Sequence, residues 1–225
     1  MAKKTARTAR KNKIIDSALK IFAEKGFADA TISEISRAAG VSDATVYEYF
    51  KTKEDLLFTI PEEITEEPVR EMEKILPFLR GAESKLRAIV QGYMTLYEMN
   101  PDYTALVMLQ LKTSRNFLKT KSYEKVRSIA QMLLKGIQEG IDDGTFHKET
   151  DPYLVRSMIL GTIEHLCIRR HLLGAPENLV DHVDPLLDMI LDGIRMKARS
   201  KTVSVHLHIA DGRVKVEPCN TPDKT

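Results

Sequence analysis

The segment from Thr31 to Lys53, TISEISRAAGVSDATVYEYFKTK, predicts two short helices joined by a tight turn. Thr31 is followed three residues later by Glu34, which is the spacing of a capping box at the start of a helix. Gly40 has the backbone freedom needed to end that helix, and Ser42 is a favourable first residue for the next one. The pattern is that of a helix-turn-helix, whose second helix can enter the major groove of DNA.

Further characteristic positions flank this segment, from Ile14 to Leu57. They are Ile14 through Phe22, Gly26, Phe27, Thr31, Ile32, Ile35, Ala38 through Ser42, Thr45, Tyr47, Tyr49, Phe50, Lys53 and Glu54. In these residues the chain resembles the DNA-binding domain of the TetR family of bacterial repressors. The resemblance implies a homodimer with a DNA-binding head and a larger helical body that binds an inducer. It also implies a regulator rather than an enzyme.

The rest of the chain predicts an all-α fold, because apolar residues recur with helical spacing as far as Met196. Pro61 predicts a kink or a helix boundary in the segment that leaves the head. The expected organisation is a basic flexible arm at 1–12, the head at 13–58, a ligand-binding and dimerisation body at 59–200, a β-hairpin at 201–218 and a tail at 219–225.

The C-terminal hairpin is predicted from a period of two, in which apolar and polar residues alternate between 203 and 209. Asp211-Gly212 is a favoured pair for a two-residue turn, and it would place Ile209 opposite Val214 and Leu207 opposite Val216. A lone hairpin is only marginally stable in water, so we expect it to dock on the helical body or to pair across a dimer.

Composition agrees with a globular protein of 225 residues. No stretch sustains the roughly 18 apolar residues that a membrane span needs, no apolar signal core follows the basic N-terminus, and the expected location is the cytoplasm. Cys167 and Cys219 lie too far apart in sequence for a CxxC metal motif. The net charge is only +2, but six positive charges precede Asp16. This run is either a solvated tail or an arm that contacts phosphates or the minor groove.

The predicted DNA-binding residues lie in or next to the second helix of the motif. They are Thr31, Ser42, Asp43, Ala44, Thr45, Tyr47, Tyr49 and Lys53. The family resemblance implies that Thr31 and Tyr49 contact the DNA backbone and that Lys53 binds a phosphate. Asp43 departs from the family pattern; it either accepts a hydrogen bond from a cytosine or serves only the start of the helix.

The body is similar to that of family members that respond to fatty acids and bind acyl-CoA, through the segments 109–116 and 159–164. The candidate ligand-binding residues combine apolar side chains for an alkyl chain with basic ones for the coenzyme phosphates. They are Met94, Tyr97, Met108, Leu111, Lys112, Arg115, Met158 and Arg169. No cofactor is expected. A drug-like or aromatic effector is the alternative to acyl-CoA.

Other interpretations remain open at this stage. A helical enzyme would use His165, Cys167 and His171, although no arrangement of a nucleophile with its base is visible. A metal-responsive regulator would use His206 and His208 with Glu217 across the hairpin. The helices expected at 151–173 and 181–196 match the family's dimerisation pair, and a two-fold dimer predicts a palindromic operator.

Overall fold

The computed structural model describes residues 2–196, 205–210 and 213–218, with side chains for residues 6–196. The chain divides into two units, Met1–Arg195 and Met196–Thr225.

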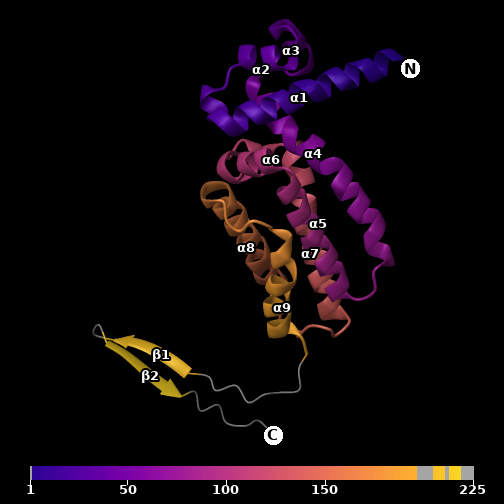
Figure 1. Ribbon diagram of the computed structural model, residues 1–225. Coiled ribbons are helices and arrows are strands. Elements are labelled where there is room, and N and C mark those ends of the chain that lie inside the picture. Colours follow the sequence, from indigo (N-terminus) through magenta and orange to yellow (C-terminus); the bar gives the residue numbers. More distant parts are fainter. Residues whose placement is uncertain (1, 197–204, 211–212, 219–225) are drawn as a thin grey trace. The chain divides into compact units, whose positions relative to one another are not determined.

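Three helices form the head of the first unit: α1 (Ala2–Asp29), α2 (Ile32–Ala39) and α3 (Asp43–Tyr49) (Figure 1). Their shared core is fully buried and includes Phe22, Ile35 and Val46. Helix α1 begins at Ala2, so the segment expected to be a flexible arm forms the first turns of a helix instead. Near its end, Gly26 adopts φ 80° and ψ 163°, which interrupts the helical backbone.

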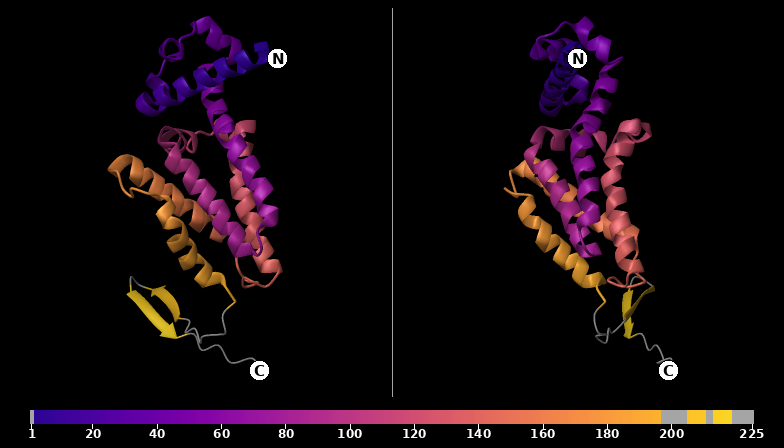
Figure 2. Two further views of the ribbon diagram at one scale, coloured as in Figure 1. Left: turned by 45° about the vertical axis from the view of Figure 1, so that its right-hand side comes forward. Right: turned by 90° about the vertical axis from the view of Figure 1, so that its right-hand side faces the viewer.

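Helix α4 (Lys53–Ile75) connects the head to the body, as both views in Figure 2 show. The helix continues through Pro61 and Pro68 rather than ending near Pro61. Ile60 and Pro61 are both buried in this turn. Packing of the turn therefore outweighs the loss of one backbone hydrogen bond to proline.

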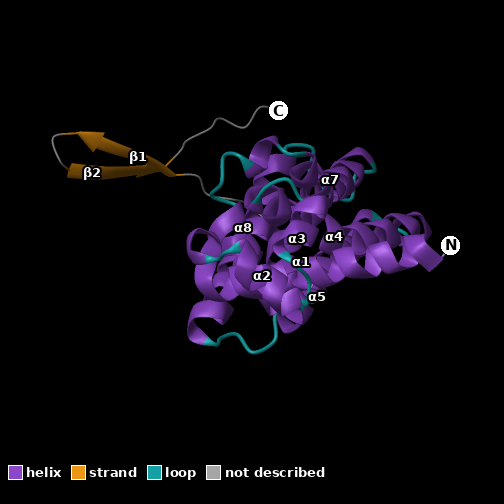
Figure 3. Ribbon diagram, turned by 90° about the horizontal axis from the view of Figure 1, so that it is seen from above, coloured by secondary structure: helices purple, strands orange, loops and turns teal. Residues whose placement is uncertain are grey.

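The body completes the first unit, and seen from above its helices lie beneath the head (Figure 3). Its elements are η1 (Leu76–Phe78), α5 (Ala82–Met99), α6 (Pro101–Leu106), the π-helical turn η2 (Val107–Leu111), η3 (Phe117–Lys119), α7 (Lys121–Asp142), α8 (Pro152–Leu173), η4 (Val180–His182) and α9 (Val183–Ile194). Helix α7 packs against α4 and α5, while α8 packs against α7 and α9. In the part of the chain that the structure describes, none of the helices is long and apolar enough to cross a membrane.

The second unit contains the strands β1 (Val205–Ala210) and β2 (Arg213–Pro218). They pair antiparallel, with Ile209 opposite Val214 and Leu207 opposite Val216. The predicted fold class needs a correction here, because it made a hairpin part of the helical fold. The two strands pair with each other in a unit of their own, and the all-α fold is that of Met1–Arg195 alone. The predicted turn pair Asp211-Gly212 lies outside the described residues.

Candidate nucleic-acid interface and effector site

The helix-turn-helix is held by the caps that its sequence predicted. The Glu34 backbone N–H donates to Thr31 Oγ1 at 3.2 Å, and the Thr31 N–H donates to the Glu34 carboxylate at 3.0 Å. Hydrogen bonds from Lys25 and Thr31 lower the pKa of Glu34 to about 2. Gly40 ends α2 with φ 65°, and Ser42 Oγ accepts from the Thr45 N–H at 3.1 Å to begin α3. The capping predictions are confirmed.

Helix α3 turns one side into the protein and leaves the other accessible. Val46 is fully buried, whereas the Tyr47 side chain is 54% exposed. Ser42 and Ala44 are exposed on the same short helix, and Thr45 is half-buried with its hydroxyl 2.9 Å from that of Ser42. A short helix with hydroxyl and aromatic groups on its free side suits contact with base edges and sugars.

Asp43 joins α3 to α2. Its carboxylate accepts a hydrogen bond from Ser33 Oγ at 2.5 Å and another from Ser36 Oγ. These two bonds lower the pKa of Asp43 below its usual value. Both carboxylate oxygens are thus bonded within the protein, so the side chain fixes the angle between the two helices.

Lys53 lies under the end of α1. Its Nζ donates to the carbonyl oxygens of Phe27, Ala28 and Ala30 at 2.6, 3.2 and 2.7 Å. The ammonium group also lies 4.5 Å from the centroid of the Phe27 ring. All three N–H donors of an ammonium group are used here, which makes Lys53 the cap of α1 after its break at Gly26.

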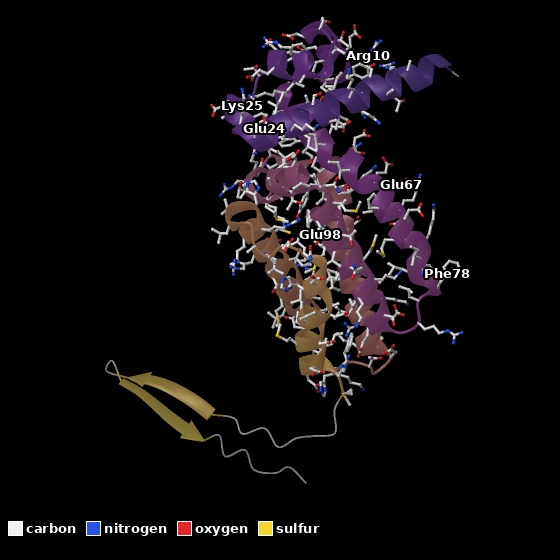
Figure 4. The ribbon with its side chains drawn as sticks, viewed as in Figure 1. Arg10, Glu24, Lys25, Glu67, Phe78 and Glu98 are labelled. Atoms are coloured by element: carbon white, nitrogen blue, oxygen red, sulfur yellow. The ribbon has the colours of Figure 1, made fainter. Side chains whose placement is uncertain are left out.

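Basic residues of α1 come next to α3, which the sequence did not predict. Tyr49 donates from its hydroxyl to the Arg7 carbonyl oxygen at 3.3 Å, and the Arg7 guanidinium lies 5.6 Å from the Tyr49 ring centroid. Arg10 and Glu48 border the same hollow of about 580 Å³, and Figure 4 labels Arg10 on α1 beside α3. Arg7 and Arg10 are three residues apart, which places both on one side of a helix, and this spacing could have indicated the contact with α3.

The eight candidate ligand-binding residues are not brought together. Four are buried in the body core: Met94, Tyr97, Met108 and Leu111. Lys112 pairs with Glu164 of α8, while Arg115, Met158 and Arg169 are exposed. None of the eight lines the cavities between α4, α5 and α7.

Among the residues that border those cavities, the sequence indicated only Met132 as a flexible lining for an alkyl chain. The larger, about 450 Å³, is lined by Glu73, Leu76, Pro77, Lys85, Ile89, Ser128, Gln131, Met132, Lys135, Gly136 and Glu139. The smaller, about 40 Å³, is more apolar and is lined by Pro68, Val69, Met72, Ile89, Gly92, Tyr93, Leu96, Ile129 and Met132. Ile89 and Met132 border both. A cavity bordered by two lysines therefore shares part of its lining with a more apolar one.

The residues of the enzyme hypothesis do not form a nucleophile and base. Cys167 is buried, and burial raises the pKa of its thiol to about 12. His165 and His171 of the same helix are exposed. The metal hypothesis lies elsewhere: the side chains of His206, His208 and Glu217 are outside the described part of the structure. Among the side chains that are described, no group of three or more metal-ligating residues occurs.

Helices α8 and α9 carry exposed apolar side chains. Leu154, Met158 and Leu172 are 59%, 48% and 62% exposed along α8, and Met189 on α9 is 74% exposed. Gly161 lies on α8 with open space where a Cβ would be. Spacings of four, three and eleven residues between Leu154, Met158, Gly161 and Leu172 place these α8 positions on one face, which can approach another helix closely.

Comparison with known proteins gives matches along most of the chain. Residues 14–60 match the family model of bacterial regulatory proteins, tetR family, and residues 62–193 match that of the YsiA-like protein, C-terminal region. The fatty acid metabolism regulator protein of Bacillus subtilis is 29% identical over 184 residues, which cover 82% of this chain and 95% of that protein. The repressor KstR2 of Mycolicibacterium smegmatis is 23% identical over 201 residues, covering 86% and 94%.

Two solved structures have the same fold. FadR of Bacillus subtilis in complex with stearoyl-CoA has a TM-score of 0.74 and 29% identity, covering 81% of this chain and 98% of that chain. FadR of Bacillus halodurans has a TM-score of 0.74 and 29% identity, covering 84% and 97%.

Proposed function

The chain belongs to the TetR family of bacterial regulatory proteins, and from this premise we propose that it is a homodimeric repressor released from a palindromic operator by a fatty acyl-CoA. Membership of this family establishes the general activity of the chain, which is that of a ligand-responsive transcriptional repressor. The observation that carries the effector proposal is the similarity to FadR of Bacillus subtilis, whose structure contains stearoyl-CoA. The repressor acts in the cytoplasm, where operator DNA is accessible, and needs no cofactor.

The exposed side of α3 is the proposed surface for base contacts, with Ser42, Ala44, Thr45 and Tyr47 at the major groove. Thr31 and Tyr49 flank it and contact the DNA backbone. Arg7 and Arg10 lie beside Tyr49 and add positive charge on the same side. Phosphate contacts of this kind supply much of the affinity, while the α3 side chains supply the choice of sequence. Asp43 and Lys53 act indirectly, by holding the head in shape.

The proposed effector site is the pair of cavities between α4, α5 and α7. Met72, Ile89 and Met132 provide an apolar path for an alkyl chain, and methionine side chains adapt readily to such a guest. Lys135 is exposed at the mouth of the larger cavity and is available to a phosphate group, whereas Lys85 is paired with Glu139. Met94, Met108 and Leu111 are buried in the body core and do not line these cavities.

Gln110 is the proposed link between the effector site and the head. Its side chain donates from Nε2 to the Phe22 carbonyl oxygen and accepts from the Phe27 N–H, both at 2.9 Å. These two backbone groups lie on either side of the break in α1 at Gly26. A ligand that shifts the α6–η2 segment would therefore move α1. To release DNA, the ligand must bind the shifted state more tightly than the DNA-competent one.

The exposed apolar face of α8 and α9 is the proposed dimer interface. Met158 belongs to this face rather than to the ligand site, since 48% of its side chain is exposed beside the open space at Gly161. Two heads related by a two-fold axis would contact two half-sites of a palindrome.

Footprinting on the chain's own promoter region tests the DNA proposal. We expect protection of a palindrome whose half-sites are separated by about one helical turn of DNA. Calorimetry of the DNA-free protein with long-chain acyl-CoA tests the effector proposal separately. We expect binding that replacement of Met132 by a larger, charged residue abolishes. Protection of a non-symmetric site would contradict the dimer proposal, and the absence of acyl-CoA binding would contradict the effector proposal.

A further inference from the structure

Three tyrosines form a buried cluster at the junction of α5 and α6. The ring centroids of Tyr93 and Tyr97 are 4.6 Å apart, and the Tyr97 ring stacks on that of Tyr103 at 6.1 Å. The three side chains are at most 7% exposed. They are three of the seven tyrosines of the chain, which has no tryptophan.

Two of the three hydroxyl hydrogens in this cluster have no hydrogen-bond acceptor among the described residues. Tyr97 donates to the Tyr93 oxygen at 2.7 Å. The Tyr103 hydroxyl is buried without any hydrogen-bond partner among the described residues. The Tyr93 hydroxyl accepts the bond from Tyr97, and no acceptor for its own hydrogen is found in the same part of the chain. Two buried O–H groups thus point to a missing acceptor, because buried polar groups in folded proteins are almost always paired.

Burial keeps these hydroxyls protonated. Desolvation raises the pKa of Tyr93, Tyr97 and Tyr103 above the ordinary tyrosine value of 10.0. They therefore act as donors and not as phenolates at physiological pH. A suitable ligand group is an uncharged oxygen acceptor, since a carboxylate or phosphate would be costly to desolvate at this depth.

The cluster adjoins the proposed effector site. Tyr93 lines the smaller cavity, which shares Ile89 and Met132 with the larger one. Ile89 and Met132 therefore border both the lysine-bearing cavity and the cavity that Tyr93 lines. The small cavity must widen to admit an alkyl chain, and the flexible thioethers of Met72 and Met132 on its border can move.

We propose that Tyr93 and Tyr103 donate hydrogen bonds to an oxygen atom of the bound effector, so that Tyr103 determines effector specificity. The inference rests on the proposed acyl-CoA response and narrows it. The oxygen is either the thioester carbonyl or a hydroxyl or keto group on the acyl chain. A site built with such donors discriminates against an analogue that lacks the oxygen, because the donors then stay unpaired.

Release of the full-length protein from operator DNA tests this with three kinds of ligand. S-hexadecyl-CoA is a thioether without an acyl oxygen, hexadecanoyl-CoA has the thioester oxygen only, and a series of hydroxyhexadecanoyl-CoA isomers adds a chain oxygen. The test variant is Tyr103→Phe. The control is Tyr123→Phe, which makes the same change at a half-buried tyrosine of α7 that lies outside the cluster. For the unaltered protein and the control, we expect an oxygen-bearing ligand to act at about tenfold lower concentration than the thioether.

Tyr103→Phe should lose this advantage while its response to the thioether stays the same. The melting temperature of the ligand-free variant should not fall, because the hydroxyl that it lacks has no partner. Raman spectra of the unaltered protein provide a second readout that does not need the variant: the tyrosine Fermi doublet should shift when the oxygen-bearing ligand binds.

The outcomes are distinguishable. An advantage that survives in Tyr103→Phe, or no advantage in the unaltered protein, overturns the inference and leaves the acyl-CoA proposal standing. Equal advantages for the thioester alone and for the hydroxylated series identify the thioester carbonyl as the oxygen, and a further gain with one isomer identifies the chain oxygen. Release by none of these ligands overturns the acyl-CoA proposal, and the inference with it.

Discussion

Asp43 and Lys53 are charged residues of a DNA-binding head, yet their hydrogen bonds are made to the protein itself. Asp43 accepts from Ser33 and Ser36, and Lys53 donates to three carbonyl oxygens at the end of α1. Both residues shape the surface that meets DNA without having to touch it. The distinction between shaping and contacting the DNA can be measured, because the two roles respond differently to pH and to salt.

Replacement of Asp43 by Asn should lower stability without changing the preferred operator. The hydrogen bonds from Ser33 and Ser36 lower the pKa of Asp43 in the folded protein below its ordinary value of 3.8. The stabilisation by these hydrogen bonds is therefore complete at pH values above the ordinary pKa. It is lost as the pH falls through the lower pKa of the folded protein. Melting curves of the two proteins should differ at neutral pH and converge in acid. A changed base preference in operator selection would show instead that Asp43 contacts a base.

Replacement of Lys53 by Met should reduce the free energy of unfolding by about 1–3 kcal/mol, because three backbone carbonyl oxygens lose a charged donor. Lys51 is exposed and provides the control, since Lys51→Met leaves these carbonyls bonded. The salt dependence of DNA binding should be the same for Lys53→Met and the unaltered protein. A slope lower by about one unit would reveal a phosphate contact by Lys53.

At the scale of elements, α1 is one helix with a break at Gly26, and Gln110 of the body bonds the backbone on both sides of that break. The π-helical turn η2 holds Gln110 between the buried side chains of Met108 and Leu111. Gln110 thus connects the body to the head at the break in α1. The coupling that we propose requires this contact to have two arrangements, one bonded and one broken.

Replacement of Gln110 by Met keeps the length of the side chain but removes both hydrogen bonds. We expect faster hydrogen exchange at the Phe27 amide, which loses its acceptor, and little change at the buried amides of α7. Operator affinity without ligand should remain, while acyl-CoA should release the variant less effectively. An unaltered ligand response would show that coupling follows another route, such as α4.

The sequence predicted elements where the signal is local and missed contacts that depend on partners far along the chain. Thr31 and Ser42 cap helices through groups three residues away, so their roles followed from spacing. Met94 and Met158 looked alike as candidate ligand residues, yet one is fully buried and the other lies on an exposed face. Periodicity shows that a helix has an apolar side, but not whether a core, a ligand or a second subunit covers it.

Dependence on partners far along the chain also explains the other differences between the predicted and the observed structure. Met72 and Ile129 border the smaller cavity from α4 and α7, and only the packing of the body brings these two helices together. The interruption predicted at Pro61 did not occur, because burial of Ile60 and Pro61 stabilises the continuous helix.

In the complete repressor that we propose, two copies of the chain associate through α8 and α9. Replacement of Leu154 by Glu should raise the dissociation constant of the dimer by about tenfold or more, since a charge would enter an apolar contact. Phe78 is 85% exposed on η1 and provides the control as Phe78→Glu (Figure 4). Sedimentation velocity should show monomers for Leu154→Glu only. A dimer unaffected by this change would place the interface elsewhere.

We propose that a fatty acyl-CoA releases this repressor from its operator. The most direct measurement is the fluorescence anisotropy of a labelled fragment of the chain's own promoter, bound by the protein and titrated with hexadecanoyl-CoA. We expect the anisotropy to fall to the value of free DNA, whereas free CoA at the same concentration should leave the complex intact. Anisotropy that stays at the bound value throughout the titration with acyl-CoAs of every length would contradict it.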